Sequence, residues 1–366
     1  MKKSKYSIDR RSFIAKSSLS LASVAAAGLP VTGELIEPFE KAKNKRIPTV
    51  TGEVASDKLG TTLMHEHILW FGGPGPEDPH FSPIPDHLIT DTVDFAVSLL
   101  NDAARVGIDT IVDLTPHRPI DLYEQIAKRT PVNIVVSTGF YRRLKSPKWK
   151  AAMEDEKQME MSMRKELTEG IDGKKIRAGI IKVAQEAGTL SDWEKNTFRA
   201  AAHVNKETGV PIATHTGNAL EQYNFLVRNG ANPHKILLSH VDAGRKGIPG
   251  DLMTIVKEGG YLEVDTFGQE FYTPWTELVT LLRSICDAGF ASKIIIDIDS
   301  NWHWENGKKV FEGAGPPNFD PNAANRTFAY MITDAVPKLL KSGFSMKEIT
   351  TFLVNNPRNF FSNNDA

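Results

Sequence analysis

The sequence predicts an α/β protein whose main domain is a (β/α)8 TIM barrel. Short runs rich in valine and isoleucine alternate with longer segments of helical periodicity, and most of the short runs end at a polar residue. Continuous apolar strands separated by helices are typical of parallel sheets, whose faces are covered by the helices. Eight such units, spread over about 300 residues, are the number that closes a TIM barrel.

The expected strands are runs of five or six residues, and helical patterns lie between them. In chain order, the strands are expected at residues 61–65, 109–114, 133–138, 178–183, 211–215, 235–240, 261–265 and 293–298. Helical patterns cover, for example, residues 88–105, 191–208, 275–288 and 322–341. An open doubly wound sheet is the structural alternative, and it would place a glycine-rich phosphate turn after the first strand. Residues 72–76 read Gly-Gly-Pro-Gly-Pro, which lacks the G-x-G-x-x-G spacing and in which the prolines lack N–H donors.

The first thirty residues read as an export signal that precedes the barrel. A basic start is followed by a weakly apolar, alanine-rich stretch containing Ala-Ala-Ala at 25–27, which is the layout of a cleavable signal peptide. Arg10 and Arg11 precede Ser-Phe-Ile, as in twin-arginine signals. The alternative is a basic amphipathic helix. We therefore expect a twin-arginine signal peptide over residues 1–30, a linker over 31–46, one barrel domain over 47–366 and a periplasmic or secreted location.

Composition excludes several other classes of protein. Lys plus Arg (44) balances Asp plus Glu (45), for a net charge of -1, so no basic excess points to nucleic acid. The chain has no run of about eighteen apolar residues that could serve as a membrane anchor. Its single cysteine, Cys286, allows neither an intrachain disulfide nor a thiolate metal cluster. The expected partner is a small-molecule substrate, and the suggested assembly is a homodimer.

Residues able to bind a metal stand at the ends of five expected strands. The C-terminal ends of all barrel strands meet at one face, where active sites are built. Two histidines that are two residues apart on an extended chain point the same way and can bind one ion. Singly, such residues are explained by a core hydrogen bond, a salt bridge or a helix cap, but their coincidence predicts a metal site. The set comprises His65, His67, Lys182, His215, His240 and Asp299.

Several motifs containing these residues resemble the phosphotriesterase family of the amidohydrolase superfamily. They are Thr-Leu-Met-His-Glu-His at 62–67, Ile-Val-Asp at 111–113, Ile-Arg-Ala-Gly-Ile-Ile-Lys-Val-Ala at 176–184, Gly-Val-Pro-Ile-Ala-Thr-His-Thr at 209–216 and Asn-Pro-Arg-Asn-Phe-Phe at 356–361. The similarity runs from about residue 51 to 361, and the block around the lysine is its most specific part.

The resemblance implies a centre of two divalent cations, zinc first, with manganese, cobalt or iron as alternatives. By position, the more buried metal would be held by His65, His67 and Asp299. The more exposed metal would be held by His215 and His240. Lys182 would bridge both metals as a carbamate, and chemistry supports this expectation because an ammonium group has no lone pair with which to bind a cation. Asp297 is a weaker candidate than Asp299 for the last ligand.

The expected activity is zinc-dependent hydrolysis of ester-type bonds by a hydroxide that bridges the metals. Asp299 would accept its proton as general base. Asp242 would either pass the proton to solvent or act only as a structural cap, and Asp265 would orient ligands from outside the centre. The alternative function is an exported metal-binding or solute-binding barrel without turnover.

The substrate is less clearly predicted than the chemistry. Tyr141, Trp70, Phe267 and Trp302 are the candidates for substrate binding, because they follow the strands and suggest an apolar pocket. Tyr141 stands where family lactonases carry tyrosine, which favours a lactone or carboxylic ester over a phosphotriester. Thr266 stands where lactonases carry arginine, and the motif around it resembles phosphotriesterase homology proteins, which usually replace the bridging lysine by glutamate. Both substrate classes therefore stay open.

Overall fold

The computed structural model describes residues 45–69, 84–115, 118–141, 155–186, 188–215, 217–244, 250–305, 307–311 and 326–362. The expected signal peptide, residues 31–44 of the expected linker, and Trp70 lie outside these ranges.

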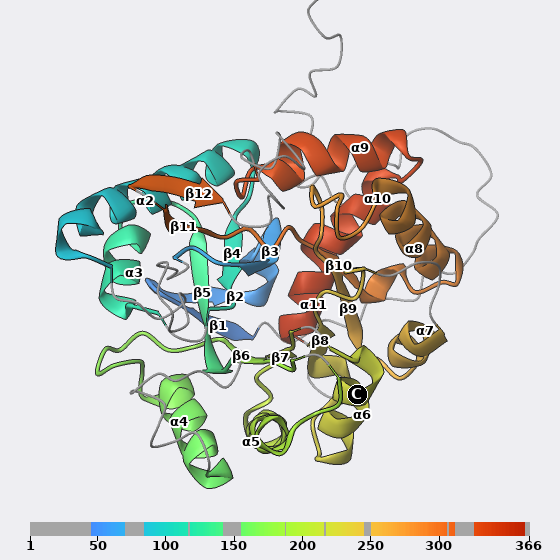
Figure 1. The fold of residues 1–366 in the computed structure, drawn as a ribbon, viewed down its shortest axis with the longest axis horizontal. Helices are drawn as coiled ribbons and strands as arrows, with labels where there is room; N and C mark the ends of the chain where they lie inside the picture. Colours follow the sequence, from blue (N-terminus) through green and yellow to red (C-terminus); the bar gives the residue numbers. More distant parts are fainter. Residues whose placement is uncertain are drawn as a thin grey trace, which may run out of the picture. The chain divides into compact units, whose positions relative to one another are not determined.

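The predicted barrel is present, with all eight strands parallel and adjacent in chain order (Figure 1). Each strand overlaps its predicted run, although most are shorter. They are β3 (Thr62–Glu66), β4 (Thr110–Asp113), β5 (Asn133–Phe140), β6 (Ile180–Val183), β7 (Ile212–Ala213), β8 (Ile236–Leu238), β9 (Tyr261–Val264) and β10 (Ile294–Ile296).

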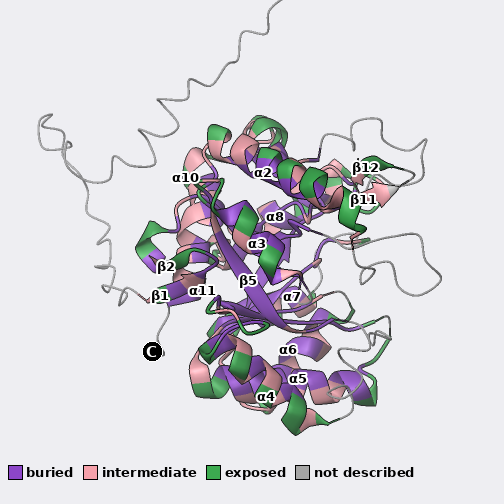
Figure 2. Ribbon diagram, turned by 90° about the vertical axis from the view of Figure 1, so that its left-hand side faces the viewer, coloured by how far each residue is buried: buried purple, intermediate pink, exposed green. Residues whose placement is uncertain are grey.

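Helices between the strands and after the last strand surround the sheet, and Figure 2 shows their buried faces turned towards it. They are α2 (Ile89–Val106), α3 (Ile120–Ala127), α4 (Glu156–Thr168), α5 (Asp192–Thr208), α6 (Ala219–Arg228), α7 (Gly250–Lys257), α8 (Trp275–Asp287), α9 (Val336–Lys341), α10 (Met346–Thr350) and α11 (Asn356–Ser362). α5 illustrates their local encoding: Ser191 and Glu194 form a capping box at its start, and Gly209 ends it with φ 64°. No helix in the described ranges combines the length and apolarity needed to span a bilayer.

The helix predicted over residues 322–341 differs from the described structure. Where the structure describes it, the segment contains a π-helical turn (Met331–Ala335) that continues into α9. A second π-helical turn (Thr351–Asn355) joins α10 to α11. The periodicity of the sequence does not resolve such local widening, because one extra residue per turn shifts the apolar stripe only slightly.

The barrel interior changes from apolar to polar along several strands. One apolar cluster takes a side chain from every strand: Met64, Val112, Val135, Ile180, Ala213, Leu237, Tyr261 and Ile295. Because strand side chains alternate between the two faces, the next inward position lies two residues later. That step leads from Ile180 to Lys182, from Tyr261 to Glu263 and from Ile295 to Asp297. The fold therefore places a polar layer next to this apolar cluster, on the side of the C-terminal strand ends.

The seam between the first and last barrel strands is closed largely by a side chain. In the described sheet, β3 and β10 are its two ends and share no hydrogen-bonded ladder. The Asp297 carboxylate accepts hydrogen bonds from the Met64 and His65 backbone N–H groups, the latter at 2.8 Å. The His67 N–H donates to the Ser300 carbonyl at 3.0 Å. Asp297 thus fills a role that a neighbouring strand would otherwise perform.

We expect Asp297→Ala to destabilise the metal-free protein strongly. It would leave two buried backbone N–H groups without an acceptor, and each such group costs about 1–3 kcal/mol. Asp297→Asn retains an acceptor oxygen and should lose much less. Urea unfolding measures both free energies of unfolding. Equal losses in the two variants would contradict the proposed seam.

Two hairpins that the sequence did not predict flank the barrel. β1 (Arg46–Thr49) pairs with β2 (Gly52–Ala55), so regular structure begins at the last residue of the expected linker. Ile47 of this hairpin packs into the interior apolar cluster, which it helps to close from the N-terminal side of the strands. β11 (Trp302–Glu305) pairs with β12 (Lys308–Phe311) just after β10. Both hairpins are too short to give a pattern distinct from a loop.

Candidate metal centre

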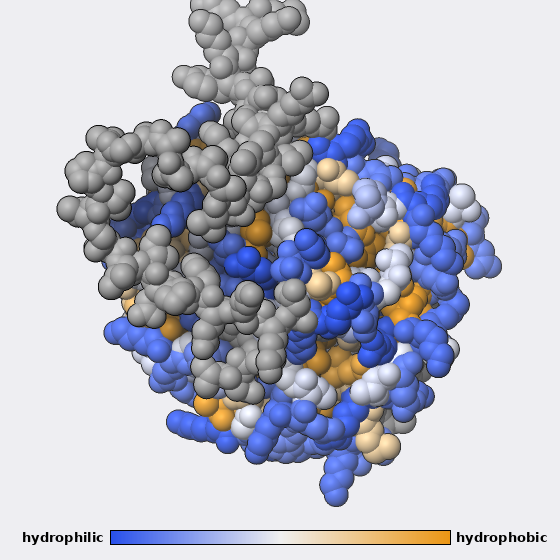
Figure 3. All heavy atoms as spheres, turned by 180° about the vertical axis from the view of Figure 1, so that it is seen from behind, coloured by the Kyte–Doolittle hydropathy of each residue, from blue (hydrophilic) through white to orange (hydrophobic). Residues whose placement is uncertain are grey.

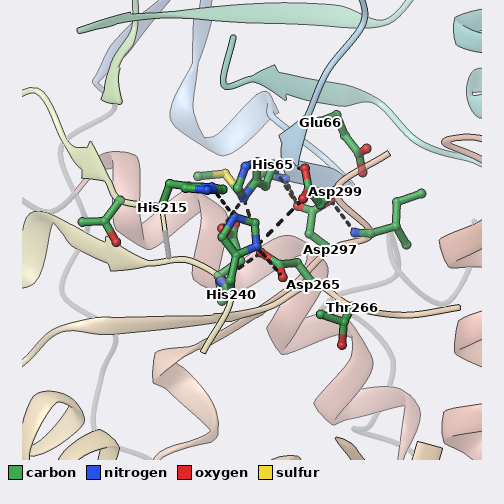
Figure 4. A network of polar contacts seen from close by, with 12 residues as sticks. His65, Glu66, His215, His240, Asp265, Thr266, Asp297 and Asp299 are labelled. Atoms are coloured by element: carbon green, nitrogen blue, oxygen red, sulfur yellow. Dashed lines mark hydrogen bonds and ion pairs between the residues drawn. The ribbon is translucent and has the colours of Figure 1, made fainter. Parts of the chain in front are cut away.

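The polar layer gathers the six predicted ligands at the C-terminal ends of five strands. Figure 4 shows His65, His215, His240 and Asp299 among them. The first group is formed by His65, His67 and Asp299, whose candidate ligand atoms lie within 4.8 Å of one another. Asp299 Oδ1 is 3.2 Å from His67 Nε2 and 3.7 Å from His65 Nε2. The imidazoles are buried, whereas Asp299 remains partly exposed at the barrel mouth. This arrangement can hold one cation.

The second group lies on the more exposed side and is formed by His215 and His240. His240 Nε2 faces His215 Nδ1 at 2.8 Å. His240 has a left-handed backbone, with φ 58°. Its N–H donates to Asp265 Oδ2 at 3.1 Å, so the strained conformation is held by a carboxylate from the next strand.

Lys182 lies between the two groups and is completely buried. Its Nζ is 3.1 Å from His65 Nε2 and donates to the Thr214 carbonyl at 2.7 Å. Burial lowers the pKa of Lys182 to about 8, against the pull of nearby carboxylates. A larger share of this amine is therefore neutral near pH 7 than for a solvated lysine.

Three of the four histidines are oriented by partners outside the centre. His65 Nδ1 lies 2.8 Å from Glu263 Oε2, His67 Nδ1 lies 2.7 Å from Thr115 Oγ1, and His240 Nδ1 lies 3.0 Å from Asp265 Oδ1. In each ring the other nitrogen faces the centre. This pattern, with one ring nitrogen held and the other presented, is typical of metal-binding histidines. The donor set therefore fits two cations that prefer nitrogen and oxygen ligands.

The electrostatics favour the protonation states of His65 and Asp299 that can bind a cation. Burial and the nearby Lys182 lower the pKa of His65 to about 3, so its imidazole is neutral. Burial alone would raise the pKa of Asp299, but the facing His65, His67 and His240 lower it well below its usual range. Neutral imidazoles and an ionised carboxylate are the forms that bind cations.

Two further buried residues support the centre and were missed by sequence analysis. Burial raises the pKa of Glu263, which lies on β9, to about 7. Arg326 is also fully buried; its Nε donates to the Phe267 carbonyl at 2.9 Å, and its Nη2 donates to the Ile298 carbonyl. This holds the backbone next to Asp299, whose φ is 46°. Glu263 could have been predicted, because it lies two residues after the inward-facing Tyr261 on the same strand. Arg326 belongs to no periodic pattern in the sequence.

The carboxylates of Asp242 and Asp297 bind backbone groups and do not belong to the cluster of candidate metal-binding atoms. Asp242 accepts hydrogen bonds from the Asp265 N–H at 3.3 Å and from the Thr266 N–H at 3.1 Å. This geometry favours the structural role of Asp242 over the proton relay that was its alternative. Asp297 closes the strand seam, and Asp299 is the strand-end aspartate that faces His67.

The candidate substrate residues differ in where they lie. Tyr141 Oη is 3.0 Å from His215 Nε2, at the edge of the centre. Phe267 is completely buried and packs edge-on against Trp275. Trp302 is also buried, and its indole N–H donates to the Ile68 carbonyl at 3.0 Å. Phe267 and Trp302 therefore shape the walls behind the site.

Comparisons with known proteins show the family of this chain. The sequence profile of the Phosphotriesterase family matches residues 45–361. An aryldialkylphosphatase of Saccharolobus solfataricus is 32% identical over 332 residues, 87% of this chain and 100% of that protein. A phospho-furanose lactonase of Mycoplasmopsis synoviae is 29% identical, covering 86% of this chain and 91% of that protein. The solved organophosphorus hydrolase of Deinococcus radiodurans matches with a TM-score of 0.72 at 30% identity, covering 86% of this chain and 96% of that chain. The chain therefore belongs to the phosphotriesterase family of hydrolases.

Proposed function

We propose that this hydrolase uses two divalent cations, most simply zinc, to cleave a lactone, carboxylic ester or phosphotriester. The observation that carries the proposal is the double orientation of the imidazoles: one nitrogen of each of His65, His67 and His240 is held from outside, and the other faces the centre. A barrel that only binds solute has no need for an ionised carboxylate among these nitrogens. Asp299 supplies that carboxylate.

Bound cations would supply a hydroxide nucleophile near neutral pH and would polarise the scissile carbonyl or phosphoryl group. Asp299 is suited to accept the nucleophile's proton, since its partly exposed carboxylate faces both His65 and His67. Arg326 fixes the adjacent backbone, so the carboxylate does not need to reorient during the reaction. The buried imidazoles exclude bulk water from the inner side of the site.

Lys182 is proposed to be carboxylated. Its neutral amine would attack carbon dioxide, forming an N–C bond and releasing one proton, to give a carbamate with two anionic oxygens. Burial supports this step, because it increases the neutral fraction of the amine. The position of Nζ beside His65 and below the mouth suits a ligand shared by both metals.

A hydrolysis screen tests the proposed function. Protein loaded with zinc or manganese would be assayed against lactones, aryl carboxylic esters and aryl phosphotriesters, with chelator-treated protein as the blank. We expect turnover of at least one class, lost with the chelator and restored by metal. Protein that binds about two metals per chain but turns over none of the three classes would favour the binding-only alternative.

Tyr141 provides a test of substrate class. If the substrate is a lactone or ester, the Tyr141 hydroxyl can donate to its ring oxygen or leaving group. Tyr141→Phe should then lower kcat/KM for lactones by up to about tenfold, the worth of one neutral hydrogen bond, while Tyr141→Trp should shift the preference towards aryl phosphotriesters. The hydroxyl also lies beside His215, so a purely orienting role would lower activity on every substrate alike. The ratio of the two activities in both variants separates these readings.

We also propose export through the twin-arginine route, based on Arg10 and Arg11 ahead of the alanine-rich segment. Replacing both arginines by lysine retains the positive charge but should leave the precursor uncleaved in the cytoplasm. Cell fractionation and N-terminal sequencing measure the outcome. Normal processing of the double variant would rule out this route and leave the barrel chemistry unaffected.

A further inference from the structure

Strand β9 brings two carboxylates to the centre from one face of the sheet. Glu263 lies within the strand and Asp265 follows its last residue. Because strand side chains alternate, residues two positions apart point to the same face. Both carboxylates are completely buried. Burying two carboxylates so close together is costly, so their retention calls for a role that an apolar side chain would not fill.

The two carboxylates serve different imidazoles. Glu263 Oε2 lies 2.8 Å from His65 Nδ1, whereas the nearest approach of Asp265 to the same nitrogen is 3.4 Å. Asp265 instead engages His240 twice, through the ring Nδ1 at 3.0 Å and the backbone N–H at 3.1 Å. Each carboxylate therefore has one principal imidazole, and those imidazoles belong to different groups of ligands.

The contact with Glu263 also selects the tautomer of His65. In its ionised form the Glu263 carboxylate can only accept at this distance, so the ring proton then resides on Nδ1. The lone pair is then on Nε2, which faces Lys182 Nζ at 3.1 Å. If the ring turned over or changed tautomer, an N–H would point at the centre and the His65 ligand would be lost. An orienting carboxylate of this kind raises the affinity of a metal site by about 10–100-fold.

We propose that Glu263 is the positioning residue of the more buried metal, and that Asp265 does the same for the more exposed metal. One strand thus sets the two affinities separately: Glu263 acts through His65, and Asp265 acts through His240. This inference rests on the proposed two-metal function. It goes further because it assigns to Glu263 the affinity for the more buried metal alone.

The test measures metal affinity in backgrounds that leave a single site. His215→Ala weakens the exposed site, and His67→Ala weakens the buried one. Glu263→Gln is then added to each background, because glutamine keeps the size of the side chain but removes its charge. Zinc and cobalt(II) dissociation constants are measured by competition with a chromophoric chelator, and the cobalt(II) absorption spectrum reports the coordination geometry.

In the His215→Ala background, we expect Glu263→Gln to raise the dissociation constant about tenfold or more and to alter the cobalt spectrum. In the His67→Ala background, the same substitution should leave the affinity unchanged, whereas Asp265→Asn should weaken it. Glu194→Gln is the matched control, since Glu194 is a buried carboxylate that serves the cap of α5.

Each outcome decides between readings. Equal affinities with and without Glu263→Gln in the His215→Ala background would overturn the assignment. So would an equal loss in both backgrounds, because this would indicate a general effect of the buried charge. If the unsubstituted protein bound no metal, the proposed function itself would fail. Should Glu263→Gln unfold the metal-free chain, Glu263→Asp gives a second test: its shorter carboxylate should weaken the same metal selectively.

Discussion

Lys182→Met should abolish metal binding at full stoichiometry and reduce turnover to background. The substitution removes the buried amine that is proposed to bridge the two groups of imidazoles, while filling a similar volume in the barrel. Without a shared anionic ligand, two cations a few ångströms apart would repel each other strongly. Metal analysis of the purified protein and a hydrolysis assay measure the two losses together.

Lys235→Met provides a matched control. Lys235 is also buried, and its Nζ donates to the Phe360 carbonyl at 2.7 Å, among the residues that cover the other end of the barrel. Its loss should affect the free energy of unfolding without changing metal content.

A rescue experiment tests the bridging role directly. Small carboxylates should partly restore metal binding to Lys182→Ala, because they can occupy the space of the carbamate. A Lys182→Met protein that retained two metals and full activity would refute the bridging role.

Asp299→Asn is the second large effect that we expect. Asparagine still offers an oxygen to a metal but is a poor base, so kcat should fall by about a hundredfold or more, whereas metal content should fall much less. Asparagine also tolerates the left-handed backbone at this position, where φ is 46°, so the variant should not add strain. Parallel measurements of kcat and bound metal distinguish loss of the base from loss of the ion.

Asp172→Asn controls for the backbone conformation. Asp172 is an exposed aspartate with φ 48°, so the same replacement can be made at the same backbone geometry outside the centre. It should change neither kcat nor stability. An Asp299→Asn enzyme of normal activity would require a different general base, whereas complete loss of metal would make Asp299 mainly a ligand.

The barrel and the grouping of the candidate ligands were predictable because both depend on a local repeat. Each strand is a short apolar run, and a polar residue at its end must lie at one face of the closed sheet. His65, Lys182 and Asp299 could therefore be grouped without knowing any distance. The described part of the face seen in Figure 3 is mainly hydrophilic, with scattered apolar spots.

The supporting residues were harder to predict because their roles depend on the third dimension. Glu263 lies inside a strand that reads as apolar, and Arg326 follows no periodic pattern. Asp242 and Asp265 both follow strands, yet one binds backbone N–H groups and the other orients His240. Sequence position alone cannot separate these roles, because it does not show which groups each side chain reaches.

The seam closed by Asp297 has a consequence for the order in which the molecule matures. His65 lies on the first barrel strand to leave the ribosome, His67 directly follows that strand, and Asp299 follows the last one. The group that would hold the more buried ion therefore does not exist on a nascent chain; it is created when the two ends of the sheet meet. Capture of that ion by its full set of ligands must follow completion of the barrel, because a translation product that stops before β10 would offer the two histidines and Lys182 but not Asp299.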